Sequence, residues 1–238
     1  MKNQVYDIIN GARSKGQTFL LEPEAKEVCR LYGIPITSYG VAGSIDEAVT
    51  LSKEIGFPVV LKIVSPDILH KSDAGGVVLD LKTSDGVREA YEEILANAKR
   101  YKSDAKIAGI LVQEMAPSST EVIIGMTTDP QFGPTLMFGL GGIFVEVFQD
   151  VAFRVAPIEE RDAYEMIREI KAYSILQGVR GKEPSDVKAL ADILLRVSKL
   201  VMEYREIEQL DLNPVLAYST GAKVVDARII LAKQLTNE

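Results

Sequence analysis

The stretch LKIVSPDILHKSDAGGVVLD, residues 61–80, decides the fold of the first part of the chain. It begins at the end of an apolar strand and carries Lys62 where that strand opens. A polar segment with a proline and a glycine pair follows, and a second strand begins at Val77. Two apolar runs joined by turn-forming residues predict a hairpin with a long loop. His70, the only histidine of the chain, lies in the middle of that loop.

The composition narrows the class of protein. A chain of 238 residues makes one large domain or two small ones, at roughly 150 residues per domain. The net charge of −7 argues against nucleic-acid binding. Cys29 is the single cysteine, so an internal disulfide is excluded. We expect no secretory signal after Met1 and no membrane helix, because the apolar runs fall short of the ~18 residues needed. These features predict a cytoplasmic protein.

Helical and strand patterns alternate along the chain, and each half contains both. This mixture predicts an α/β (or α+β) fold of two lobes. A short break at 116–119, rich in turn-forming residues, separates the halves. We therefore expect a leading helical segment at 1–19, a first lobe at 20–116 and a second lobe at 117–238. Ser44 with Glu47, and then Ser84 or Asp85, are the expected helix caps of the first lobe.

The first candidate site combines Lys62 with Gly75 and Gly76. A lysine at a strand end supplies a point charge for a phosphate. A glycine pair lets backbone N–H groups approach phosphate oxygens closely. Taken alone, the pattern fits an ordinary hairpin with a surface lysine better.

The second candidate is Gln113-Glu114-Met115, which follows a predicted buried strand at 107–112 and precedes the lobe boundary. A hinge between lobes is a common place for a ligand crevice. Backbone groups and a carboxylate at this point could bind an adenine and a ribose. The alternative is a strand end with an exposed charge.

The third candidate is a metal site near the C-terminal end. Side chains alternate along a strand, so Asp211 and Asn213 share one face. The returning strand, expected at 223–230, can bring Asp226 to the same place. Carboxylate and amide oxygens suit Mg²⁺, which keeps waters and takes phosphates as further ligands. The alternative is a hairpin with a polar outer face.

The fourth candidate is the glycine-rich run 139–142 with Glu146 and Arg154. The glycines could cradle an anion, and Arg154 could bind a phosphate with two hydrogen bonds. We expect the glycine run to precede a hairpin spanning 144–157 that carries Glu146 and Arg154. The alternative is a flexible turn beside a surface ion pair.

His70 is the fifth candidate. A lone histidine is more often structural than catalytic, but its polar neighbours Asp67, Lys71 and Asp73 argue against burial. Few metal-ligating side chains lie near it in sequence, which makes a transition-metal site a weak interpretation. A nucleophile that accepts and donates a phosphoryl group is the sharper hypothesis.

Together these motifs resemble the ATP-grasp family, in which two mixed α/β lobes hold ATP between them. Within it the chain is most similar to the beta subunits of ADP-forming acetyl-CoA synthetases, which are related to succinyl-CoA synthetase. The resemblance runs from about residue 20 to residue 230. The stretches that carry it are LKIVSPDILHKSDAGGV, LVQEMAP, EVIIGMTTDPQFGPTLMFGLGG, LDLNPV and VVDARI.

The resemblance implies a reversible reaction in which acetyl-CoA, phosphate and ADP give acetate, CoA and ATP. It implies that a phosphoryl group passes through His70 to ADP, with Asp211 placed to steady the phosphohistidine. Lys62 would contact the nucleotide phosphates, residues 113–115 would bind adenosine, and Asn213 with Asp226 would hold Mg²⁺. Looser assignments to nucleotide binding fall on Glu121 and Arg154, with Glu146 beside them.

The resemblance also implies a partner. No glycine fingerprint of a CoA-binding βαβ unit appears in the chain. We therefore expect a separate alpha subunit with the CoA-binding and acyl-phosphate chemistry, in an α2β2 heterotetramer. Two alternatives stay open: a self-contained carboxylate–amine or carboxylate–thiol ligase, which would tolerate loss of His70, and a nucleotide-sensing subunit, which would never be phosphorylated.

Overall fold

The chain forms two compact units. The computed structural model describes residues 2–142, 149–179, 181 and 183–233. Unit 1 consists of Met1–Ile36 and Ser118–Glu238, and unit 2 consists of Thr37–Pro117. Unit 2 is thus an insertion in the chain of unit 1. Residues 20–36, which we expected in the first lobe, belong to the larger unit instead.

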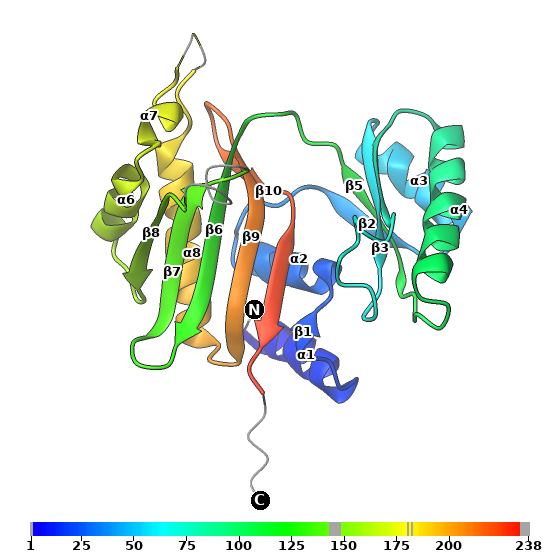
Figure 1. The fold of residues 1–238 in the computed structure, drawn as a ribbon, viewed down its shortest axis with the longest axis horizontal. Coiled ribbons are helices and arrows are strands. Elements are labelled where there is room, and N and C mark those ends of the chain that lie inside the picture. The colour runs from blue at the N-terminus through cyan, green and yellow to red at the C-terminus, as the bar shows by residue number, and fades with distance from the viewer. Residues whose placement is uncertain (1, 143–148, 180, 182, 234–238) are drawn as a thin grey trace, which may run out of the picture. The chain divides into compact units, whose positions relative to one another are not determined.

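Unit 2 is a four-stranded antiparallel sheet with two helices on one face (Figure 1). The spatial order of its strands is β2-β5-β3-β4. Its elements along the chain are β2 (Tyr39–Ala42), α3 (Ile45–Ile55), β3 (Val59–Val64), β4 (Val77–Leu81), α4 (Ser84–Tyr101) and β5 (Gly109–Glu114).

Alternation along the central strands of unit 2 separates a core face from a second face. Leu61 and Ile63 of β3 and Val112 of β5 pack into the core beneath the helices. Lys62, by contrast, lies inside β3 and not where the strand opens, because β3 continues to Val64. Its side chain therefore belongs to the second face of the sheet.

The helix caps of unit 2 differ in detail from those expected. The Ser44 side chain accepts a hydrogen bond from the Glu47 N–H at 3.3 Å, as a capping residue should. The Glu47 carboxylate, however, accepts from the N–H of Gly43 at 2.7 Å, so the reciprocal bond of the predicted capping box is displaced by one residue. Thr83, one residue before the predicted Ser84, caps α4 through the N–H of Gly86.

Unit 1 contains a seven-stranded sheet with the path β1-β11-β9-β6-β7-β8, and β10 pairs with β9 beside that path. Every strand pair in it is antiparallel. The strands are β1 (Phe19–Leu20), β6 (Thr120–Asp129), β7 (Gly133–Leu140), β8 (Val151–Val155), β9 (Ile207–Ala217), β10 (Ala222–Val224) and β11 (Ala227–Leu231).

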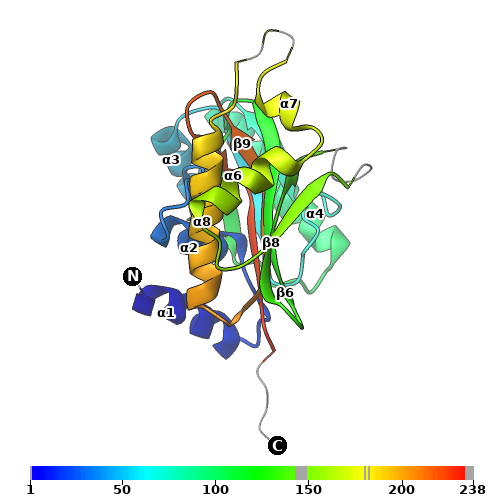
Figure 2. The ribbon, with the colours of Figure 1, turned by 90° about the vertical axis from the view of Figure 1, so that its left-hand side faces the viewer.

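The helices of unit 1 cover one face of this sheet (Figure 2). They are α1 (Lys2–Ser14), α2 (Glu22–Leu31), α6 (Glu160–Glu169), α7 (Tyr173–Leu176) and α8 (Val187–Glu203). A single apolar core joins their buried faces to alternate residues of the strands. This core explains why residues 20–36 belong here: β1 pairs with β11, and the apolar face of α2 packs on β11.

Two strand predictions in unit 1 need correction. The strand expected at 223–230 is interrupted at Val225-Asp226, between β10 and β11. The hairpin expected at 144–157 lies partly outside the described residues, and its described strand, β8, pairs with β7. None of the helices in the described part of the chain combines the length and apolarity needed to cross a membrane.

Candidate functional site

The face of the unit 1 sheet opposite its helices carries an ordered set of side chains. Strand register places two rows across five strands, and the members of each row are direct cross-strand partners. One row is Phe153, Met137, Gly125, Asp211 and Arg228, and the next is Val155, Thr135, Thr127, Gln209 and Ile230. Because side chains alternate along each strand, both rows share one face.

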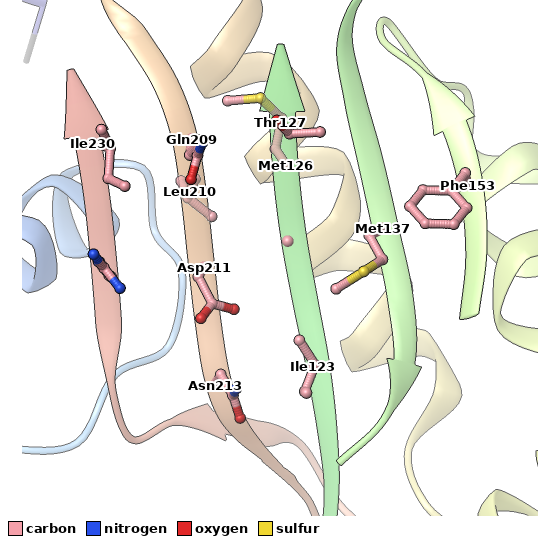
Figure 3. Close-up of a pocket in the computed structure, with 12 residues that line it drawn as sticks. Ile123, Met126, Thr127, Met137, Phe153, Gln209, Leu210, Asp211, Asn213 and Ile230 are labelled. Carbon is pink, nitrogen blue, oxygen red and sulfur yellow. The ribbon is translucent and has the colours of Figure 1, made fainter. Parts of the chain in front are cut away.

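All of the first row and Thr127, Gln209 and Ile230 of the second line a pocket of about 340 Å³. Figure 3 shows Met137 and Phe153 on one side of it and the polar residues Gln209, Asp211 and Asn213 along β9 on the other. Gly125 occupies the middle of the first row, where the absence of a side chain leaves space. The pocket thus combines an apolar wall with a polar wall, which suits a ligand with a ring and a charged end.

Asp211 is the acidic centre of the polar wall. It lies directly opposite Arg228. Burial raises the pKa of Asp211, the negative charge of Asp226 raises it further, and the positive charge of Arg228 opposes the rise. A cation bound beside the two carboxylates would relieve this repulsion.

A β-bulge lies where the backbones of two predicted metal ligands, Asn213 and Asp226, meet. The register between β6 and β9 shifts between Val122 and Ile124, so that Asn213 and Pro214 both stand against Ile123. Across the hairpin, the N–H of Asn213 donates to the carbonyl of Asp226 at 3.2 Å. The interruption between β10 and β11 therefore places Asp226 opposite Asn213.

The donor set at this bulge fits a hard cation. Among the described residues, no three His, Cys, Asp or Glu side chains gather closely enough to form a metal site by themselves. Two carboxylates and one amide, from Asp211, Asp226 and Asn213, form an all-oxygen set with few protein ligands. Mg²⁺ is bound in this way, since it retains waters and takes phosphate oxygens as further ligands.

The glycine run after β7 packs against Glu121. The N–H of Gly141 donates to the carbonyl of Glu121 at 2.8 Å, and a Cβ on Gly141 would come within 3.0 Å of the Glu121 Cβ. By strand alternation Glu121 lies on the same face as Gly125. In the glycine run 139–142, predicted to cradle an anion, Gly141 thus also allows close packing against Glu121. Glu146 lies outside the described residues.

Arg154 is not brought to the pocket. It pairs across strands with Leu136, which is fully buried in the helix-side core, while its neighbour Phe153 lines the pocket. Its guanidinium forms an ion pair with Glu169 of α6 at 2.8 Å. The structure therefore places Arg154 on the opposite face from Asp211.

In unit 2, Lys62 and Gln113 share the second face of the small sheet. Lys62 pairs with Leu111, and Gln113 with Val60, so all four alternate with the core residues of β3 and β5. Both polar side chains are buried, with 6% and 1% of their surface exposed. Lys62 and Gln113 are therefore buried polar side chains on the sheet face away from the helices, and their contact with a ligand stays a prediction.

Glu114 and Met115 have different surroundings from Gln113. Glu114 pairs with Val59, a core residue, so it lies on the other face of β5. Its carboxylate accepts a hydrogen bond from the N–H of Ser38 at 2.7 Å. The N–H of Met115 donates to the carbonyl of Pro58 at 3.0 Å, and its side chain is partly exposed.

The loop between β3 and β4 exposes His70, while Ile68 and Ala74 on either side are buried in the core of unit 2. The glycine pair closes this loop. The N–H of Gly75 donates to the carbonyl of Ser72, and that of Gly76 to the carbonyl of Lys71. Both N–H groups are used inside the loop, which differs from the phosphate-contacting role that we predicted for them.

The sequence reasoning missed the apolar wall of the pocket. Met137 and Phe153 belong to β7 and β8, and both strands carry apolar residues on both faces. Their sequence pattern therefore does not indicate which face is polar. Arg228 lies two residues after Asp226 and carries no role in the sequence-based prediction. A register drawn across all strands would have placed all three residues in the row of Asp211.

Comparison with known proteins agrees with this architecture. A family model described as an ATP-grasp domain matches residues 11–231. The beta subunit of acetate–CoA ligase [ADP-forming] I of Pyrococcus furiosus is 55% identical over 225 residues, which cover 94% of this chain and 97% of that protein.

Solved structures give the same result. An acetyl-coenzyme A synthetase of Ca. Korarchaeum cryptofilum, solved with coenzyme A, Ca-AMPCP and HgCl+, is 57% identical with a TM-score of 0.93, covering 95% of this chain and 99% of that one. Another structure of the same synthetase, with coenzyme A and Mg-AMPPCP, has a phosphohistidine segment pointing towards its nucleotide-binding site. It is 53% identical with a TM-score of 0.85, covering 96% of this chain and 100% of that one. The chain belongs to the ATP-grasp family, among the beta subunits of ADP-forming acetate–CoA ligases.

Proposed function

We propose that this chain is the nucleotide-binding subunit of an ADP-forming acyl-CoA synthetase and passes a phosphoryl group through His70 to ADP. The observation that carries the proposal is the exposure of His70, the only histidine, at the tip of a loop whose flanking residues are buried. A structural histidine would normally be packed or hydrogen-bonded. The phosphohistidine segment of the related Korarchaeum structure supports the same interpretation.

The step on this chain conserves atoms and charge. A terminal oxygen of the ADP β-phosphate attacks the phosphorus of phosphohistidine. A new O–P bond forms, the N–P bond breaks, and the ring nitrogen keeps the electron pair of the broken bond. Such transfers need little covalent help from the protein, so positioning and charge neutralisation supply most of the catalysis.

The pocket of unit 1 supports roles for its residues. Asn213 and Asp226 would hold Mg²⁺, which would neutralise phosphate charge during transfer. Asp211 would steady the phosphohistidine, and Lys62 and Gln113 would contact the phosphates and the adenosine. ATP or ADP is the nucleotide we propose, since related structures contain the analogues AMPCP and AMPPCP.

The acyl chemistry requires a partner. The Pyrococcus relative is named as a subunit, and we propose that the present chain likewise works with an alpha subunit that binds acetyl-CoA, in an α2β2 heterotetramer. Together they would convert acetyl-CoA, phosphate and ADP to acetate, CoA and ATP. We also propose a cytoplasmic location, consistent with the single buried cysteine, Cys29.

Labelling tests the proposal. The chain, co-expressed with its alpha subunit, is incubated with Mg²⁺ and ATP labelled in the γ-phosphate. We expect a label that is acid-labile and base-stable, as for a phosphoramidate. His70→Asn should bind nucleotide normally but lose both the label and ATP synthesis, whereas Ser72→Ala, in the same exposed loop, should retain both. Near-normal ATP synthesis by His70→Asn would favour a self-contained ATP-grasp ligase.

A mixing experiment tests the need for a partner. The isolated chain should make no ATP from acetyl-CoA, ADP and phosphate, and addition of the alpha subunit should restore synthesis. Equal rates with and without that subunit would contradict the proposed division of labour.

A further inference from the structure

Arg228 is the one cationic side chain among the described residues that line the pocket of unit 1. It is exposed, and it stands directly opposite Asp211 in the pairing of β11 with β9. In the part of the chain that the structure describes, its guanidinium nevertheless forms no ion pair and no hydrogen bond. Asp211 accepts no hydrogen bond from the described residues either. Both groups therefore line the pocket with polar atoms that are available to a ligand.

Most other arginines of the described residues are engaged by the protein itself. Arg154, on the opposite face of the same sheet, pairs with Glu169 at 2.8 Å. Among the described arginines, only Arg205, in the turn before β9, resembles Arg228 in being exposed without such a contact. Arg205 does not line the pocket, so the chain itself offers a matched comparison for Arg228.

The backbone at Arg228 is held firmly. The adjacent residues Ala227 and Ile229 are buried in the core of unit 1. β9 pairs with β11 along one side of Arg228, whereas β1, on the other side, reaches back only to Ile229 in the pairing that the structure describes. The Cα of Arg228 is therefore fixed, while its side chain has a neighbouring strand on one side alone.

A phosphoryl group is the ligand that fits this arrangement. A guanidinium presents a rigid fork of N–H donors that binds two phosphate oxygens at once. Neighbouring strands lie about 4.8 Å apart, so a group beside the Asp211 carboxylate on β9 is within reach of a long side chain on β11. The negative charges of Asp211 and Asp226 repel an anion at this place, and the positive charge of Arg228 offsets that repulsion.

We propose that Arg228 is a catalytic residue that binds the phosphoryl group in transit between ATP and His70 and stabilises its charge. This inference rests on the proposed function and deepens it. When ATP phosphorylates the chain, a ring nitrogen of His70 attacks the γ-phosphorus. An N–P bond forms, the bond from phosphorus to the bridging oxygen breaks, and ADP keeps the electron pair. Arg228 forms no covalent bond in this step and donates hydrogen bonds to the equatorial oxygens, over which the transition-state charge is spread.

Two nucleotides separate this role from a general one. ADP lacks the group that is transferred, whereas AMPPCP, which a related structure contains, carries a terminal phosphoryl group that is not transferred. A contact to the transferred group strengthens the binding of AMPPCP and leaves that of ADP unchanged. A contact to the other phosphates, or a role in folding alone, alters the binding of both.

The test compares variants of the complete complex with its alpha subunit. Arg228→Gln removes the charge and the fork, and Arg228→Lys keeps the charge without the fork. Arg228→Ala removes the side chain and leaves space for added guanidinium ion. The matched control is Arg205→Gln, which removes the same charge from an exposed arginine outside the pocket.

Three quantities are measured in the presence of Mg²⁺: the single-turnover rate of His70 labelling by ATP, and the dissociation constants of ADP and of AMPPCP. We expect Arg228→Gln to slow labelling roughly a hundredfold to a thousandfold, as the loss of one donor to transition-state charge does. It should weaken AMPPCP binding roughly tenfold, as the loss of a hydrogen bond to a charged group does, with ADP binding unchanged.

The other variants refine the result. Arg228→Lys should be intermediate, because a point charge remains where the fork is lost. Guanidinium ion should restore part of the labelling rate of Arg228→Ala, which a misfolded site would not allow. Arg205→Gln should match the unaltered complex in all three quantities.

The possible failures are distinguishable. Normal labelling by Arg228→Gln would overturn the role of Arg228 and leave the proposed function standing. Slow labelling with equal losses of ADP and AMPPCP binding would do the same, as would a labelling rate of Arg228→Ala that guanidinium ion leaves unchanged. No label on the unaltered complex would overturn the proposed function, and the role of Arg228 with it.

Discussion

Asn213 and Asp226 face each other across the last hairpin, held by a backbone hydrogen bond of 3.2 Å from the N–H of Asn213 to the carbonyl of Asp226. The bulge in β9 and the break between β10 and β11 meet at this point. Two departures from regular strand structure therefore bring the backbones of Asn213 and Asp226 together. Asn213 lines the pocket with Asp211, and the charge of Asp226 raises the pKa of Asp211.

Asn213→Ala and Asp226→Ala should weaken nucleotide binding in the presence of Mg²⁺ by more than roughly tenfold, since even the loss of an outer-shell partner can have that effect. Titration calorimetry with ADP, with and without Mg²⁺, measures the change. Glu208→Ala removes an exposed carboxylate of the same strand that does not line the pocket and serves as the control. Unchanged Mg²⁺-dependent affinity in both variants would exclude this pair as metal ligands.

Gly76→Ala should destabilise unit 2. The added Cβ would come within 2.5 Å of the Ile63 Cγ2 and 3.0 Å of the Lys71 carbonyl oxygen. Overpacking of this kind costs about 1–3 kcal/mol. Gly11→Ala is the matched control, because its Cβ would meet nothing within 4 Å and alanine favours a helix by about 0.5–1 kcal/mol. Chemical denaturation distinguishes the two, and a Gly76→Ala chain as stable as the unaltered one would contradict the packing argument.

Asp186→Ala should lower stability by about 1 kcal/mol near pH 7, as the loss of a helix cap does. The Asp186 carboxylate accepts from the N–H of Ala189 in α8 at 3.0 Å and from the N–H of Gly221 in the β9–β10 turn at 2.8 Å. These bonds, that from Gly221 first, lower the pKa of Asp186 below its ordinary value.

A lowered pKa fixes the pH dependence of this effect. The carboxylate stabilises the fold fully above the pKa of the unfolded chain, about 4, and the contribution is lost as the pH falls through the lower folded value. The stability difference between the unaltered chain and Asp186→Ala should thus shrink below about pH 4. Asp192→Ala, at an exposed position of the same helix, is the control variant.

The sequence predicted well those features that depend on local alternation. The shared face of Asp211 and Asn213 follows from the period of a strand, and the structure places Asp226 opposite Asn213. Ser44 caps α3 as predicted. The cap of α4 lies one residue before the predicted one because Thr83 and Ser84 are both good capping residues, and only the backbone conformation chooses between them.

Features that depend on long-range packing could not be predicted in this way. The sequence does not reveal that Arg154 faces the helix side, because a one-residue change of strand register moves a side chain to the other face. It also does not reveal that the amides of Gly75 and Gly76 are used within their own loop. Nor does it show that β1 pairs with β11, more than 200 residues away, which assigns residues 20–36 to unit 1.

The insertion of unit 2 within unit 1 imposes an order on biosynthesis. When the ribosome has made residue 117, every strand and helix of unit 2 is present, and it can fold as the chain emerges. The apolar faces of α1 and α2 must wait for most of the remaining chain, since β9 and β11 come near its end. A nascent chain therefore carries a folded unit 2 together with an N-terminal segment whose apolar side chains are still exposed. That segment is the natural target of a chaperone during translation.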